Sequence, residues 1–269
     1  MTAPSPWRSV WRWLLVPWTL VVFFPLVIVT TILWGFLAVA LSLVDRRLGF
    51  YAGTIWAWCL VHASFVRVRV EGREHLRPGT SYVLLANHQG NYDILALYGF
   101  LGRQFRWVIK EELRKVPFLG WGCAAIGHIF VDRSDSRRAL ASLEAAKPRL
   151  AGGVSVVFFP EGTRSSDGTL GRFKKGGFVM ARQLGLEIVP VAIAGSYAVL
   201  PKGCLFPQPG TIRVRIHPPL AASEHPDEAA LVARVRDTIA AGLVAGCRLD
   251  DQPAAVKPNR FRDLRIPYT

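Results

Sequence analysis

The longest uncharged stretch of the chain lies near its start. From Trp13 to Val44, thirty-two consecutive residues carry no charged side chain. As one straight helix they would extend about 48 Å, whereas the hydrocarbon core of a bilayer is about 30 Å thick. The stretch therefore predicts an apolar, membrane-embedded helix that either tilts strongly or is broken at Pro17 and Pro25.

A second apolar stretch, residues 50–65, begins shortly after the basic turn Asp45-Arg46-Arg47. Two helices joined by that turn would either span the membrane or form a hairpin that lies in one leaflet. Arginines flank the first stretch on both sides, so charge assigns no orientation. A cleaved signal peptide is disfavoured, because its apolar core is only about 7–15 residues long. We expect residues 1–63 to be membrane-embedded helices.

Composition excludes a disordered chain and narrows the kinds of partner. The 269 residues are 51% hydrophobic and 19% charged, with a net charge of +14. Such an excess attracts nucleic acid, an anionic membrane or phosphorylated substrates. The apolar start favours the last two, and the chain has no recognised nucleic-acid-binding motif. Four cysteines without C-x-x-C spacing predict thiols rather than a metal site.

Beyond residue 64, short apolar runs alternate with amphipathic segments. This alternation predicts an α/β domain, with a largely parallel sheet flanked by helices. We expect the domain to cover residues 64–248 and to be followed by a polar tail, residues 249–269. The expected strands are 65–70, 81–87, 105–110, 128–132, 155–160, 187–195 and 211–216. The expected helices are 92–102, 136–147, 176–185 and 227–246.

The heptapeptide NHQGNYD, residues 87–93, places a histidine and an aspartate between two apolar runs. On one helix, residues five apart project about 140° from each other. If His88 instead ends a strand and Asp93 lies in the first turn of the next helix, the two side chains can meet. A carboxylate that holds one ring nitrogen leaves the other as a general base. A purely structural contact fits this heptapeptide equally well.

A second cluster, FPEGTRSSDGTLGRFKKG at residues 159–176, follows an expected buried strand. Ligands bind beyond the carboxyl ends of strands in parallel sheets. Glycines let the backbone approach closely, and an arginine with nearby lysines suits a phosphate group. The cluster therefore predicts a phosphate-binding loop, and Lys110 at the end of another strand adds a cation. A solvated charge run explains poorly why the cluster adjoins a buried strand.

Together, N-H-x-x-x-x-D and F-P-E-G-T-R-S resemble the glycerolipid acyltransferase family, and most closely its 1-acyl-sn-glycerol-3-phosphate (lysophosphatidate) acyltransferase branch. Further matching blocks are KEEL at 110–113, FKKG at 173–176 and VPVAI at 189–193. The blocks cover about residues 80–200 in the family's order and spacing. Gly90 departs from the pattern, because many members carry serine there.

The resemblance implies that His88 takes the proton from a lysophospholipid hydroxyl as it attacks an acyl thioester, and that Asp93 orients His88. The implied reaction acylates the sn-2 hydroxyl of 1-acyl-sn-glycerol 3-phosphate and forms phosphatidic acid. Acyl-CoA or acyl carrier protein would be the donor, with no cofactor or metal. Backbone amides near residues 88–91 are expected to stabilise the oxyanion. The implied substrate-binding residues are Lys110, Glu161, Gly162, Thr163, Arg164, Lys174 and Lys175.

The implied location is the cell membrane, with the catalytic domain on its cytoplasmic face. The acceptor remains open among lysophosphatidate, another lysophospholipid, an ornithine or aminoacyl lyso-lipid, and glycerol 3-phosphate. A membrane-bound thioesterase gives no reason for a phosphate-binding loop. A non-enzymatic membrane scaffold gives none for His88 and Asp93.

Overall fold

The computed structural model describes residues 15–132, 138, 141–142, 144–150, 152–224 and 227–248. Its strands are β1 (Val66–Glu71), β2 (Val83–Ala86), β3 (Phe105–Lys110), β4 (Ile129–Val131), β5 (Ser155–Phe158), β6 (Ile188–Ala194) and β7 (Gly210–Ile216). Its helices are α2 (Phe24–Val44), α3 (Arg46–Ala63), α4 (Tyr92–Phe100), α5 (Leu119–Ile126), α7 (Gly176–Leu184), α8 (Ser196–Val199) and α9 (Glu228–Arg248).

The strands form one sheet in the order β1-β7-β6-β2-β5-β3-β4. Neighbouring strands are parallel except β6 and β7, which are antiparallel. Strands β1 and β7 therefore run against the other five. The predicted α/β domain with a largely parallel sheet is confirmed.

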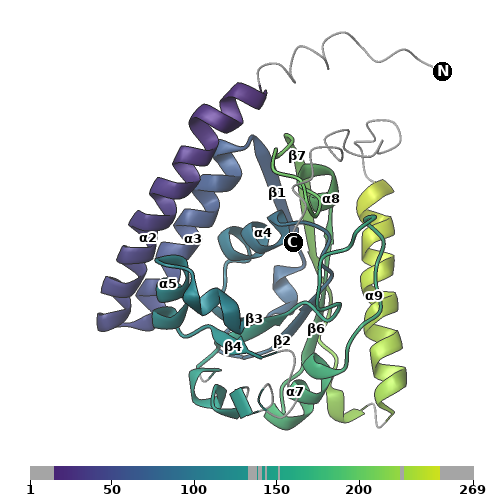
Figure 1. The fold of residues 1–269 in the computed structure, drawn as a ribbon. Helices are drawn as coiled ribbons and strands as arrows, with labels where there is room; N and C mark the ends of the chain where they lie inside the picture. Colours follow the sequence, from purple (N-terminus) through teal and green to yellow (C-terminus); the bar gives the residue numbers. More distant parts are fainter. Residues whose placement is uncertain are drawn as a thin grey trace, which may run out of the picture.

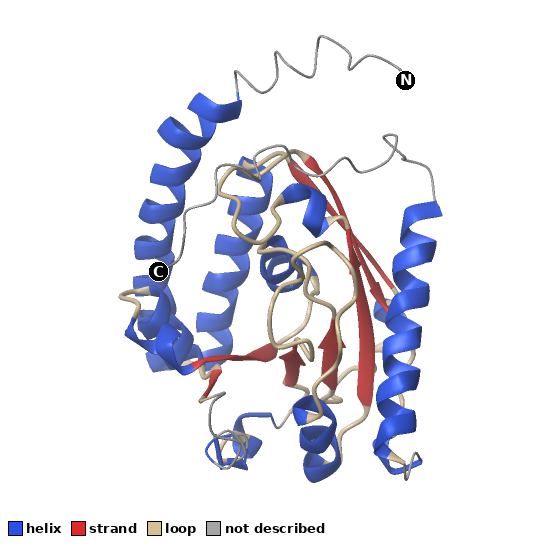
Figure 2. Ribbon diagram, turned by 45° about the vertical axis from the view of Figure 1, so that its right-hand side comes forward, coloured by secondary structure: helices blue, strands red, loops and turns tan. Residues whose placement is uncertain are grey.

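Helices cover both faces of the sheet (Figures 1 and 2). The central strand β2 shows why, because its side chains alternate between two apolar cores. Leu84 and Ala86 pack with α3 and α4, whereas Val83 and Leu85 pack with α7 and α9. All four residues are buried, as expected for a strand covered on both faces.

The chain changes its direction along the sheet at β2 and β5, which are adjacent and parallel. From β2 it passes through α4 to β3, on the far side of β5. From β5 it passes through α7 to β6, on the far side of β2. Because α4 and α7 lie on opposite faces, the loops after β2 and β5 diverge. Ligands bind beyond the strand ends at such a switch point.

One continuous helix from Leu15 to Val44 is long and apolar enough to cross a membrane. It is not broken at Pro17 or Pro25, so that alternative is wrong. A π-helical segment, Thr19–Phe23, lies between the two prolines. A wider turn relieves the clash between a proline ring and the carbonyl four residues earlier.

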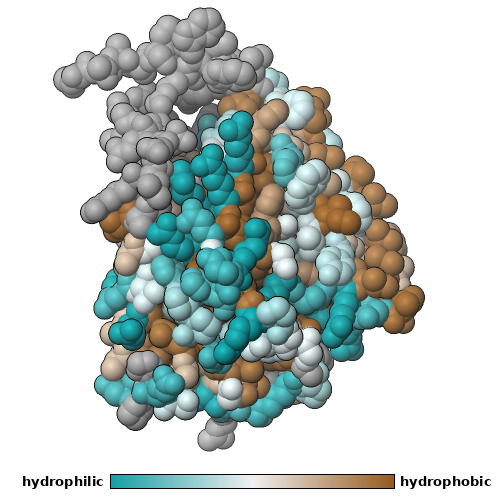
Figure 3. All heavy atoms as spheres, turned by 180° about the vertical axis from the view of Figure 1, so that it is seen from behind, coloured by the Kyte–Doolittle hydropathy of each residue, from teal (hydrophilic) through white to brown (hydrophobic). Residues whose placement is uncertain are grey.

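The long helix and α3 form an antiparallel pair that packs on the α/β core. Helix α2 contacts both α3 and α5 (Figures 1 and 2). At the turn between α2 and α3, the Asp45 carboxylate accepts the Arg47 N–H over 2.7 Å and caps α3. Only 6% of the most apolar window of the first helix is buried, unlike the core helix of a soluble domain. Apolar side chains therefore gather along this edge of the molecule (Figure 3).

Other expectations about the elements are met only partly. Helices α5 and α8 were not anticipated from the sequence. The helix expected over 136–147 and the tail over 249–269 lie largely or wholly outside the described residues. The division at residue 63/64 falls between the end of α3 and the start of β1, and the three-part domain organisation stays a prediction.

Candidate active site

His88 and Asp93 meet in the turn between β2 and α4. His88 Nδ1 lies 2.8 Å from Asp93 Oδ2, so the predicted contact is present. The Asp93 side chain is fully buried in the first turn of α4. Its Oδ2 also accepts the backbone N–H groups of Gln89 and Gly90, over 2.7 and 2.8 Å. Three donors thus converge on one carboxylate oxygen and fix the ring of His88.

The imidazole of His88 is also held by an aromatic stack. Its ring lies 3.9 Å from the ring of Phe159, with an angle of 10° between the planes. Phe159 in turn stacks on Trp107 at 5.4 Å. The His88 side chain is 12% exposed, so most of the ring is covered by the protein. Because His88 Nδ1 is hydrogen-bonded to Asp93, the ring nitrogen that can accept a proton from substrate is Nε2.

Glu161 joins the loop after β5 to the loop after β2. Its Oε1 accepts the His88 N–H over 2.7 Å, and its Oε2 accepts the Gly171 N–H over 2.9 Å. The side chain is buried, and this burial raises the pKa of Glu161, while the two N–H donors oppose the rise. The structure therefore gives Glu161 a bridging position, and its direct contact with substrate stays a prediction.

Arg164 lies over the loop that carries His88. Its Nη1 donates to Asn91 Oδ1 over 2.5 Å. The backbone reinforces this approach, because Ser165 N–H donates to the carbonyl of His88 over 2.8 Å. Beside them, Lys202 Nζ lies 3.4 Å from Thr163 Oγ1. A general-base candidate and a guanidinium therefore share one site at the carboxyl edge of the sheet.

The three lysines expected to bind substrate lie in different surroundings. A Cβ atom at Gly162, whose φ of +74° favours glycine, would be 3.0 Å from Lys174 Nζ, so Lys174 lies against the Glu161–Arg164 turn. Lys110 Nζ instead forms an ion pair with Glu112 over 2.8 Å. Lys175 pairs with Glu228 of α9 over 2.7 Å. Their roles toward substrate stay predictions.

Backbone amides near residues 88–91 were expected to stabilise the oxyanion. All four amides donate within the protein, to the carboxylates of Glu161 and Asp93 and to the carbonyl of Leu200. The same tight turn that brings His88 to Asp93 points these amides toward those acceptors, and their role toward an oxyanion stays a prediction.

The sequence reasoning missed Asn87, which anchors the loop. The side chain is completely buried, its Nδ2 donates to the Ile193 carbonyl over 2.9 Å, and its Oδ1 accepts the Ile193 N–H over 2.7 Å. The available signal in the sequence was the position of this asparagine, directly after the buried strand. A polar side chain there is either exposed or buried with hydrogen-bond partners. The glycine at position 90 also has a steric reason, because a Cβ there would lie 2.7 Å from the Ser196 carbonyl oxygen.

Among the residues that the structure describes, no group of three or more histidine, cysteine, aspartate or glutamate side chains could hold a metal ion. The chemistry that the site's side chains offer is proton transfer at His88 Nε2 beside a cationic group. This combination suits attack by an alcohol that also carries a phosphate.

Comparisons with known proteins place this site in a family. Residues 67–194 match the family model described as Acyltransferase. A 1-acyl-sn-glycerol-3-phosphate acyltransferase of Chlamydomonas reinhardtii is 34% identical over 84% of this chain and 67% of its own length. One of Pseudomonas aeruginosa is 34% identical over 75% of this chain and 80% of its own length. The chain spans about half the length of the chloroplastic relatives from Arabidopsis thaliana and Brassica napus.

The fold agrees with that of a solved relative. The crystal structure of the 1-acyl-sn-glycerophosphate (LPA) acyltransferase PlsC from Thermotoga maritima superposes with a TM-score of 0.77 at 27% identity. The match covers 91% of this chain and all of that chain. The chain therefore belongs to the 1-acyl-sn-glycerol-3-phosphate acyltransferase family and is an O-acyltransferase.

Proposed function

We propose that the protein transfers an acyl group from acyl-CoA or acyl carrier protein to the sn-2 hydroxyl of 1-acyl-sn-glycerol 3-phosphate and forms phosphatidic acid. The observation that carries the proposal is the convergence of the His88–Asp93 pair with Arg164 at one switch point of the sheet. A base and a guanidinium at one site match an acceptor that bears both a hydroxyl and a phosphate monoester. The names of the relatives point to the same acceptor.

In the proposed reaction, His88 Nε2 removes the proton of the acceptor hydroxyl as its oxygen attacks the thioester carbonyl. The tetrahedral intermediate then collapses, the C–S bond breaks, and the leaving thiolate takes the proton from the imidazolium. Asp93, whose Oδ2 is 2.8 Å from Nδ1, stabilises the imidazolium in both steps. The acyl group passes directly from sulfur to oxygen, without a serine or cysteine nucleophile.

The acceptor's phosphate would lie against Arg164, with Lys174 beside the same turn. The Arg164 guanidinium already donates one N–H to a neutral amide oxygen of Asn91, which orients it without neutralising its charge. The full positive charge of Arg164 is therefore left for the phosphate, and replacing Arg164 removes that charge.

We place the domain on a membrane with α2 and α3 lying in one leaflet. Helix α2 packs not only on α3 but also on α5 of the α/β domain, so it lies along that domain instead of standing clear of it as a separate span would. The outer side of the long helix Leu15–Val44 exposes apolar residues, which are Leu20, Val21, Ile28, Val29, Leu33 and Phe36. This arrangement holds the site near an acceptor whose acyl chain stays in the lipid. We propose the cytoplasmic face of the cell membrane as the location, where the basic chain meets anionic lipid.

An acceptor panel tests this proposal. The purified protein in detergent receives labelled acyl-CoA or acyl carrier protein with lysophosphatidate, lysophosphatidylcholine, an ornithine lyso-lipid, glycerol 3-phosphate or water alone, and products are identified by mass. We expect transfer to lysophosphatidate. Preferred transfer to another acceptor assigns that acceptor instead, and release of free fatty acid in every reaction would indicate a thioesterase.

Two variants test the assigned residues. His88→Ala should lower turnover by about 10²–10⁴-fold, the usual range for loss of a general base. Arg164→Ala should mainly raise the KM for lysophosphatidate. Arg67→Ala, which removes an exposed arginine of β1, is the matched control and should change neither constant. Normal turnover in His88→Ala, or an unchanged KM in Arg164→Ala, contradicts the respective role.

A further inference from the structure

A cavity of about 560 Å³ lies at the amino-terminal edge of the sheet. Its walls include Gly79, Gln104 and Val154, which directly precede or lie close to the starts of β2, β3 and β5. These three strands are parallel, and His88 follows the carboxyl end of β2. The cavity is therefore at the opposite edge from the candidate active site. Its volume is in the range of small-molecule binding sites, about 300–1,000 Å³.

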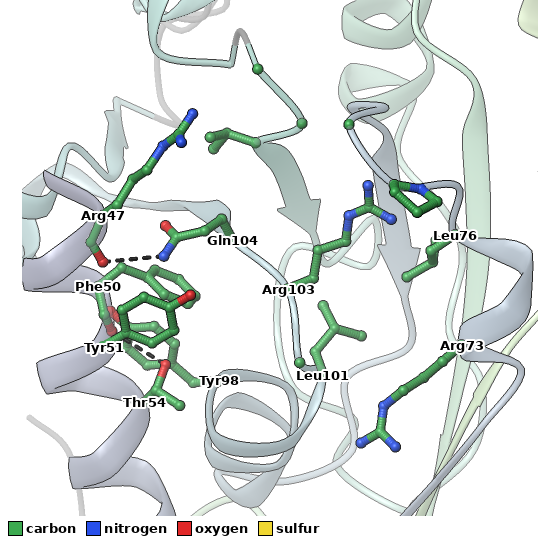
Figure 4. A pocket seen from close by; sticks show the side chains of 16 residues that line it. Arg47, Phe50, Tyr51, Thr54, Arg73, Leu76, Tyr98, Leu101, Arg103 and Gln104 are labelled. Carbon is green, nitrogen blue, oxygen red and sulfur yellow. Dashed lines mark hydrogen bonds between the residues drawn. The ribbon is translucent and has the colours of Figure 1, made fainter.

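The walls of this cavity are basic. Arg47 comes from α3 on one side, and Arg73 and Arg103 come from connections on the other (Figure 4). Among the described residues that line it, none is an aspartate or glutamate. Arg103 donates to two carbonyl oxygens over 2.6 Å, and Arg73 donates to one over 2.5 Å. Carbonyl groups orient a guanidinium without cancelling its charge, so the cavity keeps a positive potential.

A fourth arginine lies behind the wall. Arg106 is only 3% exposed, donates to Gln104 Oε1 over 3.3 Å, and lies 5.9 Å from the ring centre of Phe50. Both contacted residues line the cavity. The Arg106 Nε is buried and has no hydrogen-bond partner among the residues that the structure describes. Burial, together with the positive charges of Arg46 and Arg47, lowers the pKa of Arg106 to about 10, although Tyr98 and Asp45 act in the opposite direction. An anion in the cavity would offset this repulsion.

The cavity borders the apolar outer surface of α3. Tyr51 lines the cavity and is 54% exposed. It belongs to a stripe of exposed side chains at helical spacing, Leu48, Tyr51, Ile55 and Trp58. A basic cavity beside an apolar stripe matches a molecule with an anionic headgroup and a hydrocarbon tail.

We propose that this cavity is a second phosphate site, separate from the acceptor site, which binds a phosphate-bearing anion. The headgroup of an anionic phospholipid is its expected source, and free phosphate is the other. The choice of lipid rests on the proposed membrane function, whereas the anion site itself does not. A lipid bound there would fix the domain on the bilayer through α3, at the edge of the sheet away from catalysis.

The binding test uses the full chain in detergent, with Arg164→Ala in every protein so that the acceptor site contributes little. Titration calorimetry measures binding of inorganic phosphate and of dihexanoyl phosphatidylglycerol. Arg47→Gln should weaken binding about tenfold, as expected for loss of a charge-assisted contact. Thr54→Glu, which brings a negative charge to the cavity wall, should weaken it further. Arg67→Gln makes the same charge change on exposed β1 and should have no effect.

The two probes separate the sources. Binding of the lipid alone assigns the site to a headgroup, and binding of inorganic phosphate alone assigns it to the free anion. Absence of binding by both probes, or equal affinity in the Arg47→Gln and Arg67→Gln proteins, overturns the proposal. In detergent, Arg47→Gln with the native Arg164 should keep its turnover number, so failure of this proposal is distinguishable from failure of the proposed reaction.

Discussion

Asp93→Asn isolates the charge of the carboxylate from its geometry. Asp93 Oδ2 lies 2.8 Å from His88 Nδ1 in a fully buried position. An asparagine oxygen at the same place can still accept all three hydrogen bonds, so the ring keeps its orientation. What is lost is the attraction between carboxylate and imidazolium. At a charge separation of about 4 Å and an effective dielectric constant of about 20, this attraction is about 4 kcal/mol.

A loss of about 4 kcal/mol from the transition state corresponds to a fall in turnover of about 10³-fold. The KM for the acceptor should stay the same, because Asp93 is assigned no contact with it. The new amide NH₂ would occupy the position of Oδ1, which is buried without a hydrogen-bond partner among the described residues. We also expect the free energy of unfolding to fall by about 1–3 kcal/mol, because the three hydrogen bonds to Oδ2 lose the charge of their acceptor.

The assay is steady-state acyl transfer by the single variants and by the double variant with His88→Ala. Without the imidazole there is no developing charge for Asp93 to stabilise, so Asp93→Asn should lower turnover no further in that background. Thermal unfolding of each protein separates a folding defect from a chemical one. The reasoning is refuted if Asp93→Asn lowers turnover less than tenfold, or by the same factor with and without His88.

Three further predictions concern the frame around the site. Gly90→Ser should lower the free energy of unfolding by about 1–3 kcal/mol in denaturant titrations, because its Cβ would lie 2.7 and 2.8 Å from the carbonyl oxygens of Ser196 and Leu200. A variant as stable as the wild type would contradict this close contact. Asn87→Ala should cost at least as much, because it leaves a buried backbone pair of β6 without partners, and an unchanged denaturation midpoint would exclude this. Burial, aided by a nearby arginine, lowers the pKa of His128 to about 3, below the unfolded value of about 6.5. As pH falls below 6.5, His128 therefore takes up a proton in the unfolded chain but not in the folded one, which lowers the free energy of unfolding by about 2 kcal/mol by pH 5. His128→Gln should reduce this dependence of the free energy of unfolding on pH. An equal dependence in both proteins would contradict the assignment.

Local patterns carried most of what the sequence could predict. Continuous apolar runs marked the buried strands, and the spacing of His88 and Asp93 required a strand-to-helix turn if they were to meet. Both inferences use only neighbours along the chain, where geometry follows from residue type and spacing. The family blocks then added the chemistry that the heptapeptide alone left undecided.

Non-local pairings were beyond the sequence. Nothing in Arg67 or Arg213 specifies that β1 lies beside β7 and that both run against the rest of the sheet. The carboxylate of Glu161 was expected to face substrate, yet its two nearest donors belong to loops 73 residues before it and 10 residues after it. A break at Pro17 and Pro25 was one of two alternatives for the long apolar stretch, and the helix instead continues through a π-helical segment between the two prolines.

The bridge made by Glu161 has a consequence for altering this enzyme. Because one carboxylate accepts the backbone N–H groups of His88 and of Gly171, the segments after β2 and β5 are expected to move together. Grafting residues 159–176 from a relative with another acceptor preference would therefore also displace the imidazole of His88. Chimeras designed to change acceptor choice should therefore exchange both segments at once, with their mutual contacts intact.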